Sequence, residues 1–319
     1  MNQRLPHTEK HAYMISVLIA TCQRPLQLRQ CLLSILTTAF TDYEVLIIDQ
    51  SKDDRTKRVV SLFNNPRFIY VRETVANKSV ALNTGIQKAA GNILAFTDDD
   101  CIVSKKWLST IQKDLDSRQQ VSGVFGSTLP YRKSAHRGLR CVSTYMQNKN
   151  TVVSKPCKHS VYIGYGNNMA WKKSVCDTIR FTPWLGPNSV GQNAEDADFA
   201  LRQLIAGNKI FCDTNLVVWH DHWVDEKMRE LQDSIYIHGE MACYGNFALQ
   251  GWAFAKKVVR QNLVSSLREL TQCFRGATKP KKTTVVRLRT AFRFFWARVR
   301  GLSIGTIYFL KNMLRLSAQ

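Results

Sequence analysis

The first hundred residues alternate between short apolar runs and segments with a helical pattern. The run from Met14 to Ala20 is almost wholly apolar, as expected of a strand buried on both faces. Pro25 then opens a helix, and Lys78 to Ala90 is predicted as another helix, which Gly91 ends. Further strands are predicted at Glu44 to Asp49, Phe68 to Val71 and Ile93 to Phe96. Strands that alternate with helices predict a mostly parallel sheet with right-handed crossovers.

The second half of the chain has a less regular pattern. A strand is predicted at Val121 to Leu129, and a largely polar connection follows from Pro130 to Cys157. Asn193 to Ala206 has the pattern of a helix that Gly207 ends. Leu216 to Trp219 is predicted as a short strand that leads into His220.

Polar residues follow three of the predicted strands. Thr21 and Arg24 come after the first strand, Asp49 and Ser51 after the second, and Asp98-Asp99-Asp100 after the fourth. In an open parallel sheet the carboxyl ends of the strands form one edge, and ligands bind there. The sequence therefore predicts a binding site at this edge.

The aspartate triplet has two explanations. Three adjacent carboxylates repel one another, so the cluster is costly unless positive charge lies beside it. Mg²⁺ or Mn²⁺, held by one or two carboxylates and by substrate phosphates, would supply that charge. A solvated acidic turn that caps a helix near Ser104 is the alternative.

Several motifs occur along the chain in a specific order. Each is weak alone, but from Ile15 to His222 their order and spacing resemble an inverting family 2 glycosyltransferase with the A-type fold. The resemblance implies a single Rossmann-like α/β domain with a mixed, mostly parallel sheet over residues 14–225, and a basic helical extension over residues 226–319. The motifs are Val17 to Thr21 with Arg24-Pro25, Ile47 to Ser51, Lys78 to Ile86, Gly91 to Asp100, and Glu195-Asp196 followed by Asp198-Phe199 and Arg202.

The resemblance also implies roles for the residues at the predicted edge. The metal, Mn²⁺ or Mg²⁺, would be held by Asp100 and His220, with His222 as the second choice. A structural role is the alternative for His220, and ordinary turn or surface chemistry is the alternative for two of the nucleotide-binding residues, Thr21 and Lys78. The implied nucleotide-binding residues are Thr21, Arg24, Asp49, Lys78, Asp98 and Asp99.

Asp49 is part of a motif that departs from the family pattern. Many family members have Asp-Asp-Gly-Ser where this chain has Asp49-Gln50-Ser51. The details of how the nucleotide base is recognised therefore stay open.

A second acidic pair, Glu195-Asp196, is predicted to open a helix. The resemblance assigns the catalytic base to Asp196, with Glu195 as its neighbour facing the acceptor. The alternative is that both carboxylates only stabilise the first turn, where the helix dipole favours negative charge. An inverting transfer needs one carboxylate to take the proton of the acceptor hydroxyl as that oxygen attacks the anomeric carbon.

The implied activity is transfer of a sugar from a nucleoside-diphosphate donor, by family habit a UDP-sugar, to a saccharide or glycolipid acceptor. The loop from Gly164 to Met169 resembles the one that lines the pocket for donor sugar and acceptor. Trp184 to Gly186 lies in the variable acceptor stretch, and plain packing is the alternative for it. A sugar nucleotidyltransferase is disfavoured because its Gly-rich loop has no counterpart in Ala20 to Arg24. The full acidic set disfavours an inactive, glycosyltransferase-shaped binding module.

The net charge of +21 is unevenly placed along the chain. Gly251 to Gln319 carries 15 Lys and Arg against one acid, Glu269, and is rich in aromatic residues. A helix of this composition from Val285 to Leu316 is typical of a segment that lies on an anionic membrane surface. The alternative is that the aromatics pack on the catalytic domain and the cations are only solvated. A nucleic-acid partner is not expected, because the sheet half lacks a basic, aromatic face.

The remaining features concern the compartment. The nine cysteines are scattered without a disulfide or zinc pattern, which favours reduced thiols. Met1 to Tyr13 has no apolar stretch of the signal-peptide kind, and Gly301 to Leu310 is about half the length of a spanning helix. We therefore expect a cytoplasmic protein, peripheral at the inner face of the plasma membrane.

Overall fold

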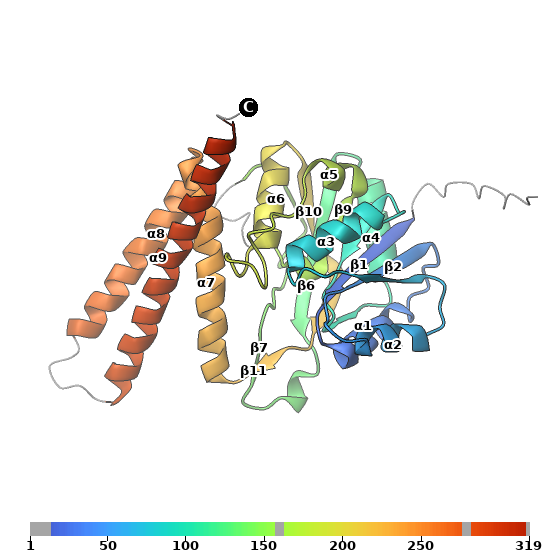
Figure 1. Ribbon diagram of the computed structural model, residues 1–319, viewed down its shortest axis with the longest axis horizontal. Coiled ribbons are helices and arrows are strands. Elements are labelled where there is room, and N and C mark those ends of the chain that lie inside the picture. The colour runs from blue at the N-terminus through green and yellow to red at the C-terminus, as the bar shows by residue number, and fades with distance from the viewer. Residues whose placement is uncertain (1–13, 157–162, 276–281, 317–319) are drawn as a thin grey trace, which may run out of the picture.

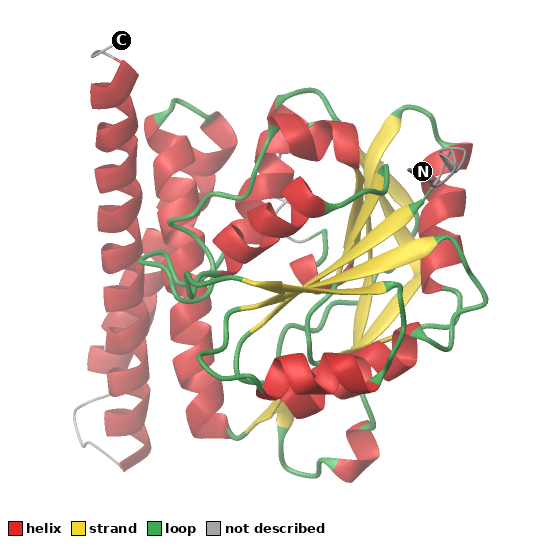
Figure 2. Ribbon diagram, turned by 45° about the vertical axis from the view of Figure 1, so that its right-hand side comes forward, coloured by secondary structure: helices red, strands yellow, loops and turns green. Residues whose placement is uncertain are grey.

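The computed structural model describes residues 14–156, 163–275 and 282–316 (Figure 1). A central twisted sheet has helices on both faces, and three long helices lie side by side at one edge of it (Figures 1 and 2). This is the α/β architecture with a mixed, mostly parallel sheet that the sequence predicts.

The first half of the chain forms the parallel part of the sheet. Its strands lie in the order β3-β2-β1-β4, and each neighbouring pair is parallel. The predicted boundaries hold to within one or two residues. The elements are β1 (Ile15–Thr21), α1 (Pro25–Ile35), β2 (Tyr43–Asp49), α2 (Arg55–Leu62), β3 (Phe68–Arg72), α3 (Lys78–Lys88) and β4 (Ile93–Phe96).

The second half adds strands in both directions. β9 lies antiparallel between β4 and β6, β10 runs parallel to β6, and β5 closes the edge antiparallel to β10. The elements are β5 (Cys101–Val103), α4 (Trp107–Ser117), β6 (Val121–Pro130), β9 (Met169–Lys172), α5 (Lys173–Thr178), α6 (Glu195–Ile205) and β10 (Lys209–His220).

Two predictions for this half were wrong in detail. The strand expected at Leu216 to Trp219 is the end of β10, which has 12 residues. Its pairing with β6 shifts register between Cys212 and Val217, and the polar residues in that gap hide the strand from the hydrophobic pattern. The predicted polar connection holds small elements: η1 (Lys133–Ala135), β7 (Arg140–Cys141), which pairs with β11 (Trp223–Val224), and β8 (Thr151–Val153), which pairs with β10.

The core lies on both faces of the sheet. Along β1, Val17 and Ile19 pack on one face with α1 and α4, whereas Leu18 packs on the other with α3 and α6. This alternation follows from the period of two in a strand, and it explains why β1 reads as a continuous apolar run.

Three helices follow the sheet domain: α7 (Glu226–Leu249), α8 (Ala253–Arg275) and α9 (Lys282–Leu316). α9 lies tightly against α7, since a Cβ atom at Gly301 would clash with the carbonyl oxygen of His238, and one at Gly305 with that of Ala242. None of the helices in the described ranges is both long enough and apolar enough to span a bilayer.

We expect Gly301→Ala to destabilise the protein. Alanine is the better helix former by about 1 kcal/mol, but here its methyl group would push on the α7 backbone and cost about 1–3 kcal/mol. The measurement is thermal unfolding, with the exposed Ser303→Ala on the same helix as the control. If Gly301→Ala matches or exceeds the stability of Ser303→Ala, the close packing of α7 and α9 is wrong.

Candidate active site

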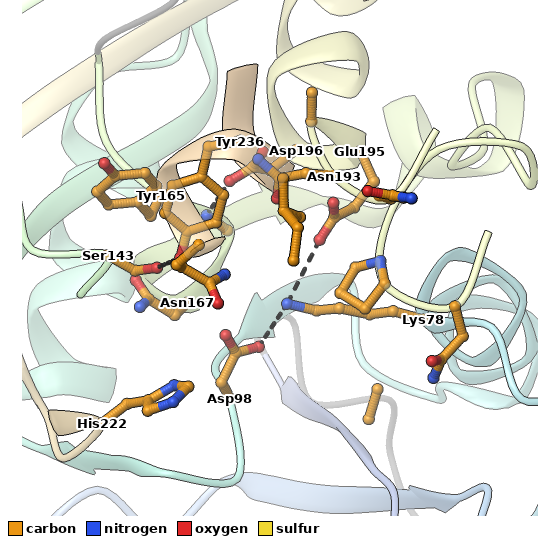
Figure 3. A pocket seen from close by; sticks show the side chains of 18 of the residues that line it. Lys78, Asp98, Ser143, Tyr165, Asn167, Asn193, Glu195, Asp196, His222 and Tyr236 are labelled. Atoms are coloured by element: carbon orange, nitrogen blue, oxygen red, sulfur yellow. Dashed lines mark hydrogen bonds and ion pairs between the residues drawn. The ribbon is translucent and has the colours of Figure 1, made fainter. Parts of the chain in front are cut away.

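A cavity of about 1120 Å³ opens at the carboxyl ends of β1 and β4. Its size suits a ligand as large as a nucleotide sugar. One wall is formed by the strand ends, and the other by the loop before η3 (Gly166–Asn168), the start of α6 and one face of α7 (Figure 3). Of the residues predicted to bind the nucleotide or the metal or to act in catalysis, all but Asp49 line this cavity: Thr21, Arg24, Lys78, Asp98, Asp99, Asp100, Glu195, Asp196 and His220.

Asp49 is fully buried behind the cavity wall. Its Oδ2 accepts a hydrogen bond of 2.8 Å from the Tyr70 hydroxyl, and its Oδ1 accepts one of 2.9 Å from the Ser51 N–H. The neighbouring Gln50 lines the cavity instead, with its amide donating 2.8 Å to the carbonyl oxygen of Asn77. The end of β2 therefore contributes to the cavity through Gln50, and Asp49 fixes the turn.

Arg24 neutralises two of the three aspartates. One of its guanidinium nitrogens lies 3.2 Å from Asp99 Oδ1 and 2.6 Å from Asp100 Oδ2. Thr21 donates a hydrogen bond of 2.7 Å to the other oxygen of Asp99. Burial works against the charged guanidinium, but the two carboxylates outweigh it and raise the pKa of Arg24 above its usual range.

Asp100 faces two histidines. His220 Nε2 lies 3.0 Å from Asp100 Oδ1, and His222 Nδ1 lies 3.8 Å from Asp100 Oδ2. The other ring nitrogen of His220, Nδ1, donates a hydrogen bond of 2.7 Å to the carbonyl oxygen of Val142, which holds the ring with Nε2 toward Asp100. These three side chains offer ligand atoms within 4.8 Å of one another.

The pKa values of Asp99 and Asp100 are shifted in opposite directions. Burial raises the pKa of Asp99, and the charge of Asp100 raises it further. Burial would raise the pKa of Asp100 as well, but His220 and Arg24 hold it below its usual value. Asp100 is thus the carboxylate that stays ionised beside the two imidazoles.

Lys78 joins the two ends of the cavity. Its ammonium nitrogen lies 2.7 Å from Asp98 Oδ1 and 3.4 Å from Glu195 Oε1 (Figure 3). Asn77 caps α3 by accepting from the Val80 N–H, which places Lys78 at the first helical position. Burial alone would lower the pKa of Lys78, but the two carboxylates hold it well above its usual value.

Asp196 is held by the backbone at the start of α6. Its Oδ2 accepts a hydrogen bond of 2.6 Å from the Gly166 N–H, and its Oδ1 accepts one of 2.8 Å from the Ala197 N–H. A Cβ atom at Gly166 would lie 2.9 Å from the Asp196 Cβ, so the loop needs glycine there. The carboxylate is thereby fixed toward the cavity.

Glu195 is buried beside Asp196. Burial raises the pKa of both carboxyl groups, while Lys78 lowers both. One oxygen of Glu195 faces Lys78, and the other has no hydrogen-bond partner in the described part of the chain.

Sequence reasoning missed most of the wall opposite the strand ends. Tyr236 of α7 contacts Ser143, with 2.6 Å between the two hydroxyl oxygens, and Tyr165 lines the same cavity (Figure 3). Tyr165 belongs to the loop that the sequence did single out. The residues from α7 and α9 carry no motif and reach the cavity only through tertiary packing; they are Leu231, Gln232, Ser234, Ile235, Tyr236, Glu240, Tyr244 and Arg300.

The C-terminal helices also hold the loop before α6. The rings of Trp184 and Tyr308 stack with 4.6 Å between their centroids. His238 Nε2 lies 2.9 Å from the carbonyl oxygen of Val190, and a Cβ atom at Gly239 would lie 2.7 Å from the Asn193 backbone. Trp184, which the sequence suggested for the acceptor stretch, therefore packs on α9 at the border of the cavity.

Comparison with curated proteins shows relatives over part of the chain. Glycosyltransferase AglE of Haloferax volcanii is 30% identical over 99 residues, which cover 30% of this chain and 33% of that protein. The GalNAc(5)-diNAcBac-PP-undecaprenol beta-1,3-glucosyltransferase of Campylobacter jejuni is 26% identical over 119 residues, which cover 36% of this chain and 38% of that protein. The chain thus spans 33% and 38% of the lengths of these two relatives.

Solved structures share the fold over more of the chain. The mannosyltransferase PcManGT from Pyrobaculum calidifontis, in complex with GDP-Man and Mn²⁺, has a TM-score of 0.63 at 16% identity, covering 94% of this chain and 88% of that one. S. aureus TarS 1-349 in complex with UDP has a TM-score of 0.53 at 15% identity, covering 72% of this chain and 65% of that one. At such low sequence identity, both structures show only that this chain shares their fold.

The family itself is shown by the sequence. The model of glycosyl transferase family 2 matches residues 16–179, half of the chain. With the A-type glycosyltransferase fold in place around the predicted acidic residues, this chain belongs to glycosyl transferase family 2.

Proposed function

We propose that the protein transfers a sugar from a nucleoside-diphosphate donor to a saccharide or lipid-linked acceptor, with inversion at the anomeric carbon. The observation that carries the proposal is the cavity itself. At one end of the cavity, Asp100 and two histidines form a cluster that suits a metal and the diphosphate it would bind. At the other end lies a fixed carboxylate, Asp196. The named relatives and the UDP-bound and GDP-Man-bound structures of the same fold support it.

The strand-end side of the cavity would bind the nucleotide. Thr21 and Arg24 orient Asp99, which would bind the ribose hydroxyls. Asp98 lies beside them and pairs with Lys78. We infer a UDP-sugar as the donor from the habit of the family and from the UDP complex of a structure with the same fold.

The side chains around Asp100 offer ligand atoms that suit a divalent ion, Mn²⁺ or Mg²⁺. Asp100 and His220 would be the ligands, with His222 alongside, because their ligand atoms converge and the carbonyl of Val142 orients the His220 ring. An ion bound there supplies the positive charge that stabilises the departing diphosphate. Arg24 keeps the neighbouring carboxylates neutralised and close together.

Asp196 is our candidate for the catalytic base. Two backbone N–H groups hold its carboxylate toward the cavity, where it would accept the proton of the acceptor hydroxyl as that oxygen attacks the anomeric carbon. One base suffices for an inverting transfer, since the acceptor oxygen displaces the diphosphate directly. Glu195 and Lys78 act as positioning residues that tie this base to the nucleotide end.

We further propose that α9 holds the protein on an anionic membrane, at the inner face of the plasma membrane. Ile307 and Leu310 are 45% and 52% exposed on this helix, next to the exposed cation Lys311. Apolar side chains flanked by cations suit the interface of an anionic bilayer. Each cation near such a surface contributes on the order of 1 kcal/mol.

Asp100→Ala should abolish transfer and weaken metal-supported UDP binding, because the metal loses its carboxylate ligand. His220→Ala should raise the metal concentration needed for half-maximal activity, with smaller damage. The measurements are Mn²⁺ titrations of activity and of UDP binding, with Asp53→Ala, an exposed carboxylate outside the cavity, as the control. Full activity of the native enzyme in excess chelator would contradict metal dependence.

Asp196→Asn should lower turnover by roughly 10²–10⁴ while UDP binding is unchanged, because the amide keeps the shape but cannot take the proton. Glu195→Gln should cost less. Steady-state rates and UDP titrations check this, and the exposed Asp177→Asn is the control. If Glu195→Gln is inactive and Asp196→Asn is near wild type, the base is Glu195.

The double variant Ile307→Ser with Leu310→Ser should lose binding to phosphatidylglycerol vesicles and keep its fold and its UDP binding. Co-sedimentation with these vesicles and with phosphatidylcholine vesicles measures the effect. The control is Leu26→Ser with Leu62→Ser, two leucines that are 72% and 81% exposed on the sheet domain. Equal vesicle binding by both double variants would rule out docking through α9.

A further inference from the structure

The protein has a second cavity, of about 930 Å³, which shares no lining residue with the catalytic one. It is formed by α1, β5, the segment around η1 and the end of β10. Trp219 and Asp221 line this second cavity, whereas His220 and His222, which alternate with them along the chain, line the first. Because side chains alternate across a strand, the two cavities lie on opposite faces of the end of β10.

The second cavity carries an excess of positive charge. Its lining contains three exposed cations, Lys105, Lys106 and Arg132, against one carboxylate, Asp221. Among the residues that the structure describes, none of these three cations takes part in an ion pair. Ammonium and guanidinium groups of this kind are suited to bind the phosphate of a ligand.

Asp221 does not cancel this charge, because its carboxylate has partners of its own. Its Oδ1 accepts a hydrogen bond of 3.0 Å from Trp223 Nε1, and His136 Nε2 lies 3.7 Å from the same oxygen. The rings of His136 and Trp223 stack with 4.4 Å between their centroids, so the three side chains form one packed group. The three cations therefore remain for a ligand.

Another part of the lining is apolar and aromatic. Leu33 of α1 is 42% exposed, and Ile102 of β5 pairs with Trp219 of β10, both half-buried. Tyr131 is half-buried as well, and the Arg132 guanidinium lies 5.0 Å from the centroid of its ring. Tryptophan and tyrosine rings offer surfaces on which a planar group of a ligand can stack. The cavity therefore combines a surface for a flat ring with cations for a phosphate.

We propose that the second cavity binds a nucleotide, with its base on Trp219 and its phosphate at the three cations. The base accounts for the aromatic surface, and the phosphate accounts for the cations that have no ion pair. This site is separate from the proposed donor and acceptor sites, and it does not depend on the transferase reaction.

The test measures the binding of AMP by the full chain, with UDP and Mn²⁺ at saturation so that the catalytic cavity is filled. Adenosine, which lacks the phosphate, and ribose 5-phosphate, which lacks the base, are titrated in parallel. We expect AMP to bind more tightly than either. The double variant Lys105→Gln with Lys106→Gln should weaken AMP binding about 10-fold or more, as for the loss of hydrogen bonds to charged groups, and leave adenosine binding unchanged.

Matched controls come from outside the cavity. Lys57→Gln with Arg58→Gln removes a neighbouring pair of exposed cations on α2 and should leave AMP binding unchanged. Leu33→Ser should weaken the binding of AMP and adenosine alike. Leu26→Ser, on the same helix but outside both cavities, should weaken neither.

The absence of AMP binding, or equal AMP binding by the native protein and the double lysine variant, would overturn the proposal. Release of bound AMP as the UDP concentration is raised would also overturn it, because AMP would then occupy the catalytic cavity. Ribose 5-phosphate bound as tightly as AMP would overturn the part of the proposal that concerns the base.

Discussion

Lys78 is the point on which both ends of the cavity depend. Six acidic side chains lie around one cavity, and burying so many carboxylates is costly unless each has a partner. They are Asp98 to Asp100, Glu195, Asp196 and Glu240. Arg24 and His220 compensate the triplet from one side. Among the residues that the structure describes, Lys78 alone bridges a triplet carboxylate and the α6 pair, so it sets the spacing between them.

The position of Lys78 follows from local rules. Asn77 caps α3, which directs the first helical residue across the end of the sheet rather than into solvent. The loop before α6 meets it from the other side, where the Lys78 N–H donates to the Pro187 carbonyl oxygen. A substitution such as Lys78→Met would leave Asp98 and Glu195 facing each other without a cation, which disfavours ionisation of both.

The sequence predicted the half of the site that local patterns determine. β1, β2 and β4 each read as apolar runs ending in polar residues, and the edge rule for parallel sheets brings those ends together. The rule predicts where residues lie but not where their side chains point. It therefore could not predict that Asp49 turns to Tyr70 while Gln50 lines the cavity. It also could not give β10 its full length, because Asp213 to Asn215 interrupt the hydrophobic pattern where the strand shifts register.

The sequence pattern could not predict the cavity wall formed by α7 and α9, for a different reason. Tyr236 and Arg300 belong to no motif, and they reach the cavity only because glycines let helices approach closely. Gly301 brings α9 onto α7, and Gly239 brings α7 onto Asn193, two residues before Glu195. A sequence pattern shows that such glycines exist, but the partner backbones that need them are known only from the fold.

The family match covers one side of the cavity rather than the whole site. The matched residues, 16–179, contain the strand ends, Lys78 and the triplet, which meet a nucleotide and a metal under the proposed function. The proposed metal ligand His220 and the proposed base Asp196 lie outside the matched residues, so the match covers only part of the chemistry. Tyr236 and Arg300 also lie outside the match, on the wall opposite the strand ends. Acceptors differ in shape and charge from one transferase to another, so this wall is free to differ in sequence, provided that it still packs against the loop that carries Asp196.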